Sequence, residues 1–274
     1  MAGKFKYLIW MFVITGLLYS CKDDSQQADD NNIDTTEVDV DVVENNMYYK
    51  FPSPVELYIF LWEEDAVYNA KLLNSTDNSA KYVTTDRKAI NFGIYASDLA
   101  YCTVFGKNQE TFNYFTTVKV LADELGLMEG FDEVMAKRID ENISNPDSLY
   151  KLSSDSYSDA ITYLESIKQG NLLPFIVAGG WIESVYIAVN SVKTFSEKSG
   201  VVMRVVEQQM VLEDMVEYLS TMQDDEQMKM LYDKLSDIKD SFDKLYDNTD
   251  EIITKDQFDE IALKINKLRN EFVN

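Results

Sequence analysis

The chain has 274 residues, of which 48 are acidic and 25 are basic, so its formal net charge is −23, and it contains no histidine. A charge of this sign repels phosphate backbones, which makes nucleic acid a poor partner. Without histidine the chain cannot build Ser-His-Asp or Cys-His catalysis, an HExxH zinc site or a histidine-ligated haem. We expect no cofactor and no bound metal. Hydrophobic residues make up 46% of the chain, enough to bury a core.

The N-terminus has the pattern of an export signal. Lys4 and Lys6 precede an apolar run over residues 7–19. These thirteen residues are too few to cross a bilayer, which takes about 20, but they fit the core of a secretory signal. An uncleaved signal anchor is the second interpretation of this segment.

Ser20 and Cys21 end this run and resemble the lipobox of bacterial lipoproteins. The resemblance implies that residues 1–20 are removed as a signal peptide and that Cys21 is acylated, for example with palmitate, as the mature N-terminus. The tripeptide KDD that starts at Lys22 is similar to the export signal of Bacteroidota lipoproteins. It implies a lipid anchor in the outer membrane, facing outward, with a periplasm-facing anchor as the alternative. Several acyl chains hold a protein stably on a bilayer, whereas one binds only marginally.

An acidic segment begins at the cysteine. Residues 21–46 are polar and contain no aromatic residue, a composition that cannot repay the entropy of ordering. We therefore predict a lipidated tether here and a helical domain over residues 47–274. The alternation over residues 38–42 (VDVDV) indicates one short strand as an alternative to plain linker. Removal of the signal peptide takes away two lysines and leaves a mature charge of −25.

From residue 53 onward the pattern is helical. The sequence SPVE at residues 53–56 has the form of a capping box with proline at the first helical position. It predicts a helix over residues 53–73. The next helices are predicted, in chain order, over residues 86–105, 109–125, 131–143 and 156–169. Glycine follows several of these segments, as is common at helix C-termini.

One apolar segment could be a membrane span or a core helix. Residues 172–192 are long and apolar, but Glu183 and Asn190 would lie inside the span. A carboxylate near the middle of a bilayer is costly, and a helix that is apolar on all sides is normally buried core. We therefore predict that this segment is the buried central helix of the bundle.

Apolar residues in the last third of the chain alternate at spacings of three and four, the pattern by which helices pack side by side. The three seams are Leu212, Met215, Leu219 and Met222; Met228, Leu231, Leu235, Ile238, Phe242 and Leu245; and Phe258, Ile261, Ile265, Leu268 and Phe272. The connection at residues 247–256 lets the last two helices fold back as an antiparallel pair. These seams predict intramolecular core, with a partner-binding groove as the alternative. The predicted fold is an all-α bundle of about eight or nine helices.

Two lone acids form the candidate site. Asp98 is the only charged residue in positions 90–105, and Glu183 is the only one in positions 172–191. If their helices pack together, the two acids could face one ligand-binding cavity. The other residues expected there are Asn91, Tyr95 and Tyr101. Paired carboxylates can hydrolyse glycosides without histidine. A structural role is the third interpretation, because a buried carboxylate needs a partner.

A second resemblance covers residues 91–127. A helix, a turn with glycine and a second helix with aromatic spacing are weakly similar to one tetratricopeptide unit, without a second copy at a period near 34 residues. The similarity implies helical-hairpin packing. The stretch also resembles helical lipoproteins of Bacteroidota, which bring no activity with them. Cys102 would have no disulfide partner once Cys21 is lipidated, and we expect it to be a small buried hydrophobe.

The sequence thus favours a membrane-anchored helical lipoprotein that acts as a non-enzymatic binding or interaction module in the cell envelope. Its expected partners are the lipid bilayer, through acylated Cys21, and an envelope protein or transporter. The alternatives are a carboxylate-dependent glycan hydrolase that uses Asp98 and Glu183, and a purely structural spacer.

Overall fold

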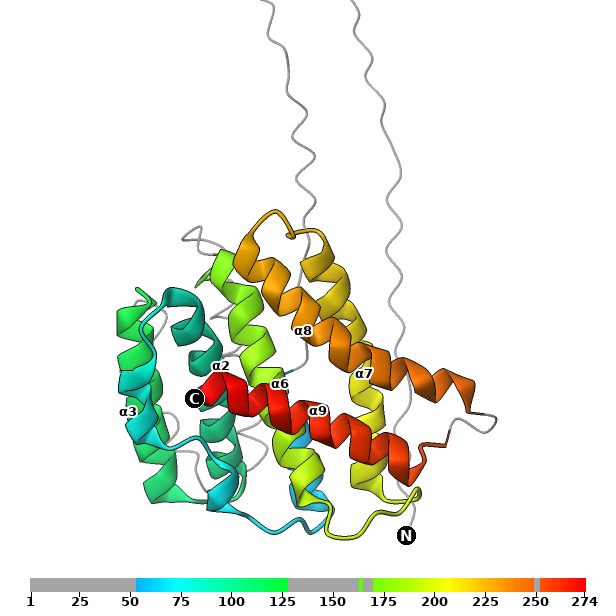
Figure 1. Ribbon diagram of the computed structural model, residues 1–274. Helices are drawn as coiled ribbons and strands as arrows, with labels where there is room; N and C mark the ends of the chain where they lie inside the picture. Colours follow the sequence, from blue (N-terminus) through cyan, green and yellow to red (C-terminus); the bar gives the residue numbers. More distant parts are fainter. Residues whose placement is uncertain (1–52, 128–162, 165–169, 249–251) are drawn as a thin grey trace, which may run out of the picture. The chain divides into compact units, whose positions relative to one another are not determined.

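The computed structural model describes residues 53–127, 163–164, 170–248 and 252–274. Within these ranges the chain is helical and has no strand, which confirms the predicted all-α multi-helix bundle (Figure 1). The α-helices bounded there are α1 (Pro54–Glu63), α2 (Thr85–Val104), α3 (Asn108–Glu124), α6 (Leu173–Ser191), α7 (Gly200–Ser220), α8 (Glu226–Asp243) and α9 (Lys255–Val273). Short 3-10 turns are η2 (Ala70–Leu72), η3 (Thr76–Lys81), η5 (Gly170–Leu172) and η6 (Lys244–Asp247).

Two helices follow the sequence prediction closely. Both α2 and α3 begin and end within one residue of the predicted ranges. Gly106, with a φ of +64°, and Gly126, with a φ of +73°, follow their last turns. Glycine adopts this left-handed conformation without a steric penalty, so it ends a helix cheaply.

Several predicted segments lie outside the described residues. They are the signal peptide and tether, the helix at 131–143, and the helix at 156–169 apart from its residues 163–164, which are helical. The short strand considered at residues 38–42 also lies outside them.

The first helix starts where predicted but ends early. Ser53 accepts a hydrogen bond from the Val55 N–H at 3.4 Å, and Pro54 takes the first helical position. The prediction that this helix continues to residue 73 is wrong, because α1 ends at Glu63.

The acidic end of α1 explains this difference. Glu63, Glu64 and Asp65 stand together at the helix C-terminus, where negative charge opposes the helix dipole. Asp65 then adopts a φ of +57°, which turns the chain out of the helical path. Residues 64–84 continue as irregular chain with two 3-10 turns, and side chains of α2, α3 and α9 bind this segment.

The central helix is α6. It contacts α1, α2, α7 and α9, and its side chains are buried over most of its length, as predicted for a core helix. Figure 1 shows it between α2 and α7. In the described part of the chain, α6 is also the helix that is long and apolar enough to cross a membrane. The same properties belong to a core helix, and here other helices cover it.

The helices α2 and α6 touch at glycines. A Cβ atom placed on Gly93 would lie 2.0 Å from the Ile176 carbonyl oxygen, and one placed on Gly179 would lie 2.0 Å from the Ile90 carbonyl oxygen. No side chain can occupy such a position. The two backbones are therefore in direct contact, which draws the neighbouring turns of both helices together.

The last two helices form an antiparallel pair, as predicted. Cross-helix ion pairs join Lys234 to Glu271, Asp237 to Lys264, and Lys244 to Glu260, so the numbers rise along α8 and η6 while they fall along α9. Every seam residue predicted for α8 and its η6 extension and for α9 is buried. On α7, Leu212, Met215 and Leu219 are buried, and Met222, just beyond the helix, is half-buried.

Alanine at Gly93 tests the glycine contact. Alanine favours a helix over glycine by about 1 kcal/mol. We nevertheless expect Gly93→Ala to lower the free energy of unfolding by about 3 kcal/mol, because the new methyl group must push α2 and α6 apart. Urea denaturation followed by circular dichroism measures the change.

The matched control is Gly200→Ala, at the first position of α7. There the new Cβ would meet only the end of the flexible Glu64 side chain. We expect its free energy of unfolding to stay within about 0.5 kcal/mol of the parent. An unchanged stability for Gly93→Ala would show that the two backbones are not in contact.

Candidate functional site

The two lone acids lie together in the fold. Asp98 on α2 and Glu183 on α6 each have an exposed fraction of 0%, and their carboxyl groups lie close enough for each to shift the pKa of the other. Arg269 of α9 completes the cluster. Its Nε donates to Glu183 Oε2 at 2.8 Å and its Nη2 donates to Oε1 at 2.9 Å. This bidentate geometry is the strongest form of the interaction.

Burial sets the protonation of this cluster. Burial and the negative charge of Glu183 raise the pKa of Asp98 well above its usual value, although Arg269 opposes the change. Burial also raises the pKa of Glu183, and the hydrogen bonds and charge of Arg269 counteract it. Because Arg269 binds both oxygens of Glu183, we expect the negative charge on Glu183 and the proton on Asp98, which would make the cluster neutral.

The two oxygens of Asp98 agree with a protonated group. Its Oδ2 accepts the Asn74 N–H at 3.1 Å. Its Oδ1 is buried and accepts no hydrogen bond in the part of the chain that the structure describes. An ionised carboxylate would leave this oxygen unpaired, at a cost of about 1–3 kcal/mol. A carboxylic acid at Asp98 would instead carry an O–H that can be donated to the neighbouring Glu183 carboxylate.

Asn74, at the end of the loop after η2, is the centre of a second set of polar contacts. It is buried, and its carbonyl accepts the Tyr114 hydroxyl at 2.9 Å. Its Nδ2 donates to the Tyr82 hydroxyl at 2.9 Å and to Asn91 Oδ1 at 3.4 Å. Together with the N–H bound to Asp98, these bonds fasten the irregular segment to α2 and α3.

Two predicted ligand residues bind the same segment. The Tyr95 hydroxyl donates to the Ser75 carbonyl at 2.7 Å. The Tyr101 hydroxyl accepts the Asn69 N–H at 3.1 Å. Both rings are 0% exposed, so their polar ends face the chain and not the solvent. In the described fold these tyrosines supply the hydrogen bonds that the loop backbone lacks within itself.

Asn91, the third predicted ligand residue, binds the end of α9. Its Nδ2 donates to the Phe272 carbonyl at 2.9 Å, and Arg87 Nη2 donates to the same oxygen at 3.3 Å. The Tyr82 hydroxyl donates to the Val273 carbonyl at 3.2 Å. The last carbonyls of a helix have no partner inside it, so these side chains cap α9.

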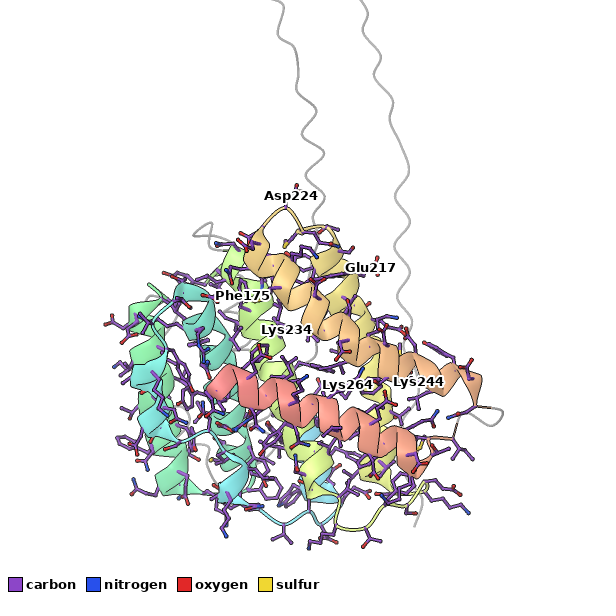
Figure 2. The ribbon with its side chains drawn as sticks, in the orientation of Figure 1. Phe175, Glu217, Asp224, Lys234, Lys244 and Lys264 are labelled. Atoms are coloured by element: carbon purple, nitrogen blue, oxygen red, sulfur yellow. The ribbon has the colours of Figure 1, made fainter. Side chains whose placement is uncertain are left out.

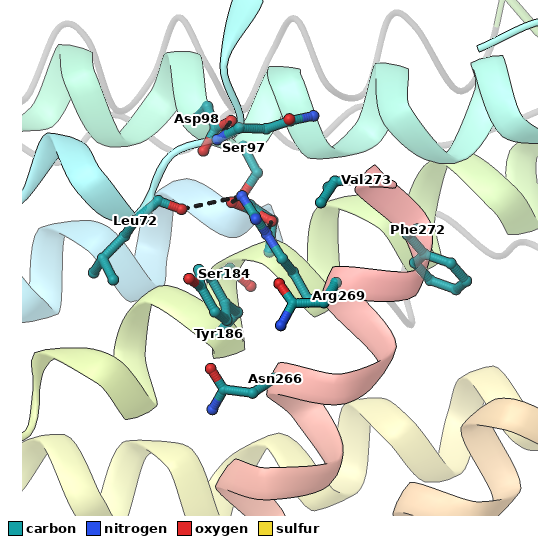
Figure 3. Close-up of polar contacts among 12 residues, drawn as sticks. Leu72, Ser97, Asp98, Ser184, Tyr186, Asn266, Arg269, Phe272 and Val273 are labelled. Carbon is teal, nitrogen blue, oxygen red and sulfur yellow. Dashed lines mark hydrogen bonds and ion pairs between the residues drawn. The ribbon is translucent and has the colours of Figure 1, made fainter. Parts of the chain in front are cut away.

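Sequence reasoning missed Arg269, although a signal was present. It lies four residues after Ile265 and three before Phe272, so helical spacing places it beside the buried seam of α9. Its exposed fraction is 6%. The guanidinium also donates to the Leu72 carbonyl at 3.0 Å and lies 4.6 Å from the centre of the Tyr186 ring (Figure 3). A cation at such a position is a natural partner for a buried acid.

Cys102 is buried, as predicted. Burial raises the pKa of its thiol to about 12, and the Tyr68 hydroxyl lies 3.5 Å from Sγ. A thiol with a pKa this high is protonated near neutral pH and is a poor nucleophile. It therefore packs as a small core residue.

A surface groove of about 590 Å³ lies between α8 and α9, and its lining includes neither Asp98 nor Glu183. The pairs Lys234–Glu271 and Lys264–Asp237 bridge the two helices there. Figure 2 labels Lys234 and Lys264 on these helices. The lining holds four lysines and four acids, so its charges balance and select no ligand by sign.

The described residues contain no cluster of three or more cysteine, aspartate or glutamate side chains arranged to hold a metal ion.

Comparison with protein-family models, with curated proteins and with solved structures found no match to this chain. What can be said of function therefore comes from the chain's own sequence and geometry.

Substitution of Asp98 tests its protonation. Asparagine keeps a carbonyl for the Asn74 N–H and supplies an N–H for Glu183, so we expect Asp98→Asn to retain the parent stability near neutral pH or to exceed it. Alanine removes both bonds, and Asp98→Ala should lower the free energy of unfolding by about 2 kcal/mol. Urea denaturation measures both, and equal losses would contradict a protonated Asp98.

The same variant gives a pH signature. The pKa of Asp98 is higher in the folded than in the unfolded chain, so above about pH 4 the unfolded chain releases a proton that the folded chain keeps. The contribution of Asp98 to stability therefore falls as pH rises from about 4 toward the folded pKa. Asp98→Asn lacks this effect, so its stability relative to the parent should increase over that range. A difference that stays constant with pH would indicate an ionised Asp98.

Loss of Arg269 should be costly. Arg269→Met leaves the charge of Glu183 buried without a partner, and we expect the free energy of unfolding to fall by about 3–5 kcal/mol. Adding Glu183→Gln to that variant removes the charge and should recover part of the loss. Arg204→Met, which breaks the exposed pair with Glu207, is the control and should cost no more than about 1 kcal/mol. Equal losses for the two arginine variants would contradict a buried ion pair.

Proposed function

We propose that this protein is a lipid-anchored helical module of the cell envelope that works by binding a partner and not by catalysis. One observation supports a binding role over a catalytic one. The polar residues that most resemble a catalytic set, Asp98 and Glu183, are buried and bound within the chain. Both carboxyl groups are closed off from solvent, and Arg269 occupies Glu183, so neither is presented to a substrate.

A glycan hydrolase that uses these two acids is the alternative. Such enzymes hold two carboxyl groups about 5–10 Å apart and open to the sugar and to water. Both carboxyl groups here have an exposed fraction of 0%, and Arg269 occupies both oxygens of Glu183. A substrate would have to break this ion pair before it met a reactive group, so the geometry favours the non-enzymatic proposal.

The anchor is supported by the residues around Cys21. A short apolar signal, the small residue Ser20 and the KDD tripeptide after the cysteine form the pattern of an exported lipoprotein. We propose that acylated Cys21 holds the protein in the outer membrane, with the helical domain facing outward, and that the partner is an envelope protein or a transporter. A periplasm-facing anchor and a structural spacer without a partner are the competing versions.

Fatty-acid labelling tests the anchor. Cells that express the full-length chain are fed a clickable palmitate analogue, and the protein is recovered and assayed for the label. We expect the label on the parent and its loss in Cys21→Ala, because the thiol at that position accepts the acyl chain. Cys102→Ala is the matched control, because Cys102 is buried in the core, and it should keep the label. A label that persists in Cys21→Ala would overturn the anchor.

Two further measurements separate the competing versions. Protease treatment of intact cells should cleave the helical domain if it faces outward and spare it if it faces the periplasm. Crosslinking from the anchored protein, analysed by mass spectrometry, should recover a recurrent envelope protein if it is an interaction module. Hydrolysis of an envelope glycan by the purified chain, lost in both Asp98→Asn and Glu183→Gln, would instead support the hydrolase.

A further inference from the structure

One face of α7 is left uncovered by the other described helices. Its members follow one another at spacings of four and three, and we call them the α7 stripe: Met203, Glu207, Met210, Asp214 and Glu217. Met210 is 71% exposed and Met203 is 40% exposed. The opposite side of α7 is buried, and the helix packs on α6, α8 and α1. Single exposed apolar residues are ordinary on a protein surface, and here two of them lie on one face of the same helix.

Further apolar groups widen this surface. Val206, half-buried, lies between the two methionines by helical spacing. Tyr246 is 69% exposed, and its hydroxyl donates to Glu213 Oε1 at 3.0 Å. Glu213 lies three residues after Met210 on α7, so this bond holds the Tyr246 ring near the stripe. Methionine and tyrosine are both enriched in protein interfaces, and methionine adapts its shape to different partners.

The charged residues of α7 are mostly acidic. The helix carries the acids Glu207, Glu213, Asp214 and Glu217. Its only basic residue is Arg204, which pairs with Glu207 at 2.7 Å and lies 4.5 Å from the centre of the Phe60 ring. Figure 2 labels Glu217 near the end of the helix that leads to α8. Asp214 and Glu217 follow the two methionines along the stripe and form no ion pair among the described residues. A surface that is apolar at one end and acidic at the other matches a partner helix that carries both apolar and basic side chains.

We propose that the α7 stripe is a docking surface for a basic amphipathic helix of a partner protein. Apolar side chains of that helix would cover Met203 and Met210, and its lysines or arginines would face Asp214 and Glu217. A second copy of this chain fits poorly, because both copies carry a formal charge of −23. An anionic bilayer surface is repelled for the same reason. The inference rests on the proposed role as an interaction module, but it needs no lipid anchor.

Two synthetic peptides of equal composition test the stripe. One, about 18 residues long, places leucines on a single helical face with lysines elsewhere; the other contains the same residues in scrambled order. Binding to the full-length chain in phosphatidylcholine nanodiscs is measured by fluorescence anisotropy at about 150 mM salt, with empty nanodiscs as the blank. We expect the amphipathic peptide to bind at least about tenfold more tightly. Equal affinities would overturn the proposal, since general charge attraction would then explain all binding.

Variants assign the binding to the stripe. A double variant, Met203→Gln with Met210→Gln, removes the apolar side chains of the stripe. It should bring the affinity of the amphipathic peptide close to that of the scrambled peptide, so that the ratio of the two approaches one. Met230→Gln, at an exposed methionine on α8, is the matched control and should leave the ratio unchanged. A ratio that survives the double variant would overturn the assignment.

A charge series completes the test. A triple variant removes the charges of the stripe and should weaken the binding of both peptides: Glu207→Gln, Asp214→Asn and Glu217→Gln. The control triple variant should weaken the binding of the peptides less, because it neutralises three exposed acids on other elements: Asp77, Asp123 and Asp240. Equal weakening by the two triple variants would contradict a local site. Because the assay does not involve acylation, its failure is separate from a failure of Cys21 to take up lipid.

Discussion

Three helices of this protein depend on one buried ion pair. Glu183 of α6 binds Arg269 of α9 through two hydrogen bonds, and Asp98 of α2, whose pKa burial raises, lies beside them. A buried charge costs several kcal/mol unless its partner is held in place, so small displacements of α2, α6 or α9 are penalised. The glycine contact between α2 and α6 brings the two acids within reach. Charge pairing and close packing therefore specify the same arrangement of helices.

The same cluster extends into the irregular chain between α1 and α2. Asn74 binds Asp98, and its other polar groups bind tyrosine and asparagine side chains of the neighbouring elements. A loop can lie against a core only if its backbone groups find hydrogen-bond partners. The residues that looked like a ligand site meet that need here. This is why the functional proposal moves from the interior to the surface, where α7 presents exposed methionines and acids.

Periodicity and end signals predicted the regular helices well. Apolar residues at spacings of three and four located α8 and α9, and Gly106 and Gly126 marked the ends of α2 and α3. The end of α1 was missed because apolar residues continue beyond Glu63, while the acids there turn the chain away. The meeting of Asp98 and Glu183 could be suspected from their isolation in apolar helices. Asn74 carried no such signal, since an asparagine in a polar loop is unremarkable until the fold surrounds it.

The sequence by itself determined which segments are helices, which of their faces are apolar, and which acids would need a partner once buried. These properties are local, because they follow from residue spacing and from the cost of desolvating a charge. Only the tertiary structure decided that Arg269 is that partner and that burial beside Glu183 raises the pKa of Asp98. It also decided that one face of α7 stays uncovered among the described helices. Those outcomes depend on how helices distant in sequence pack, and residue spacing within a single helix carries no information about its neighbours.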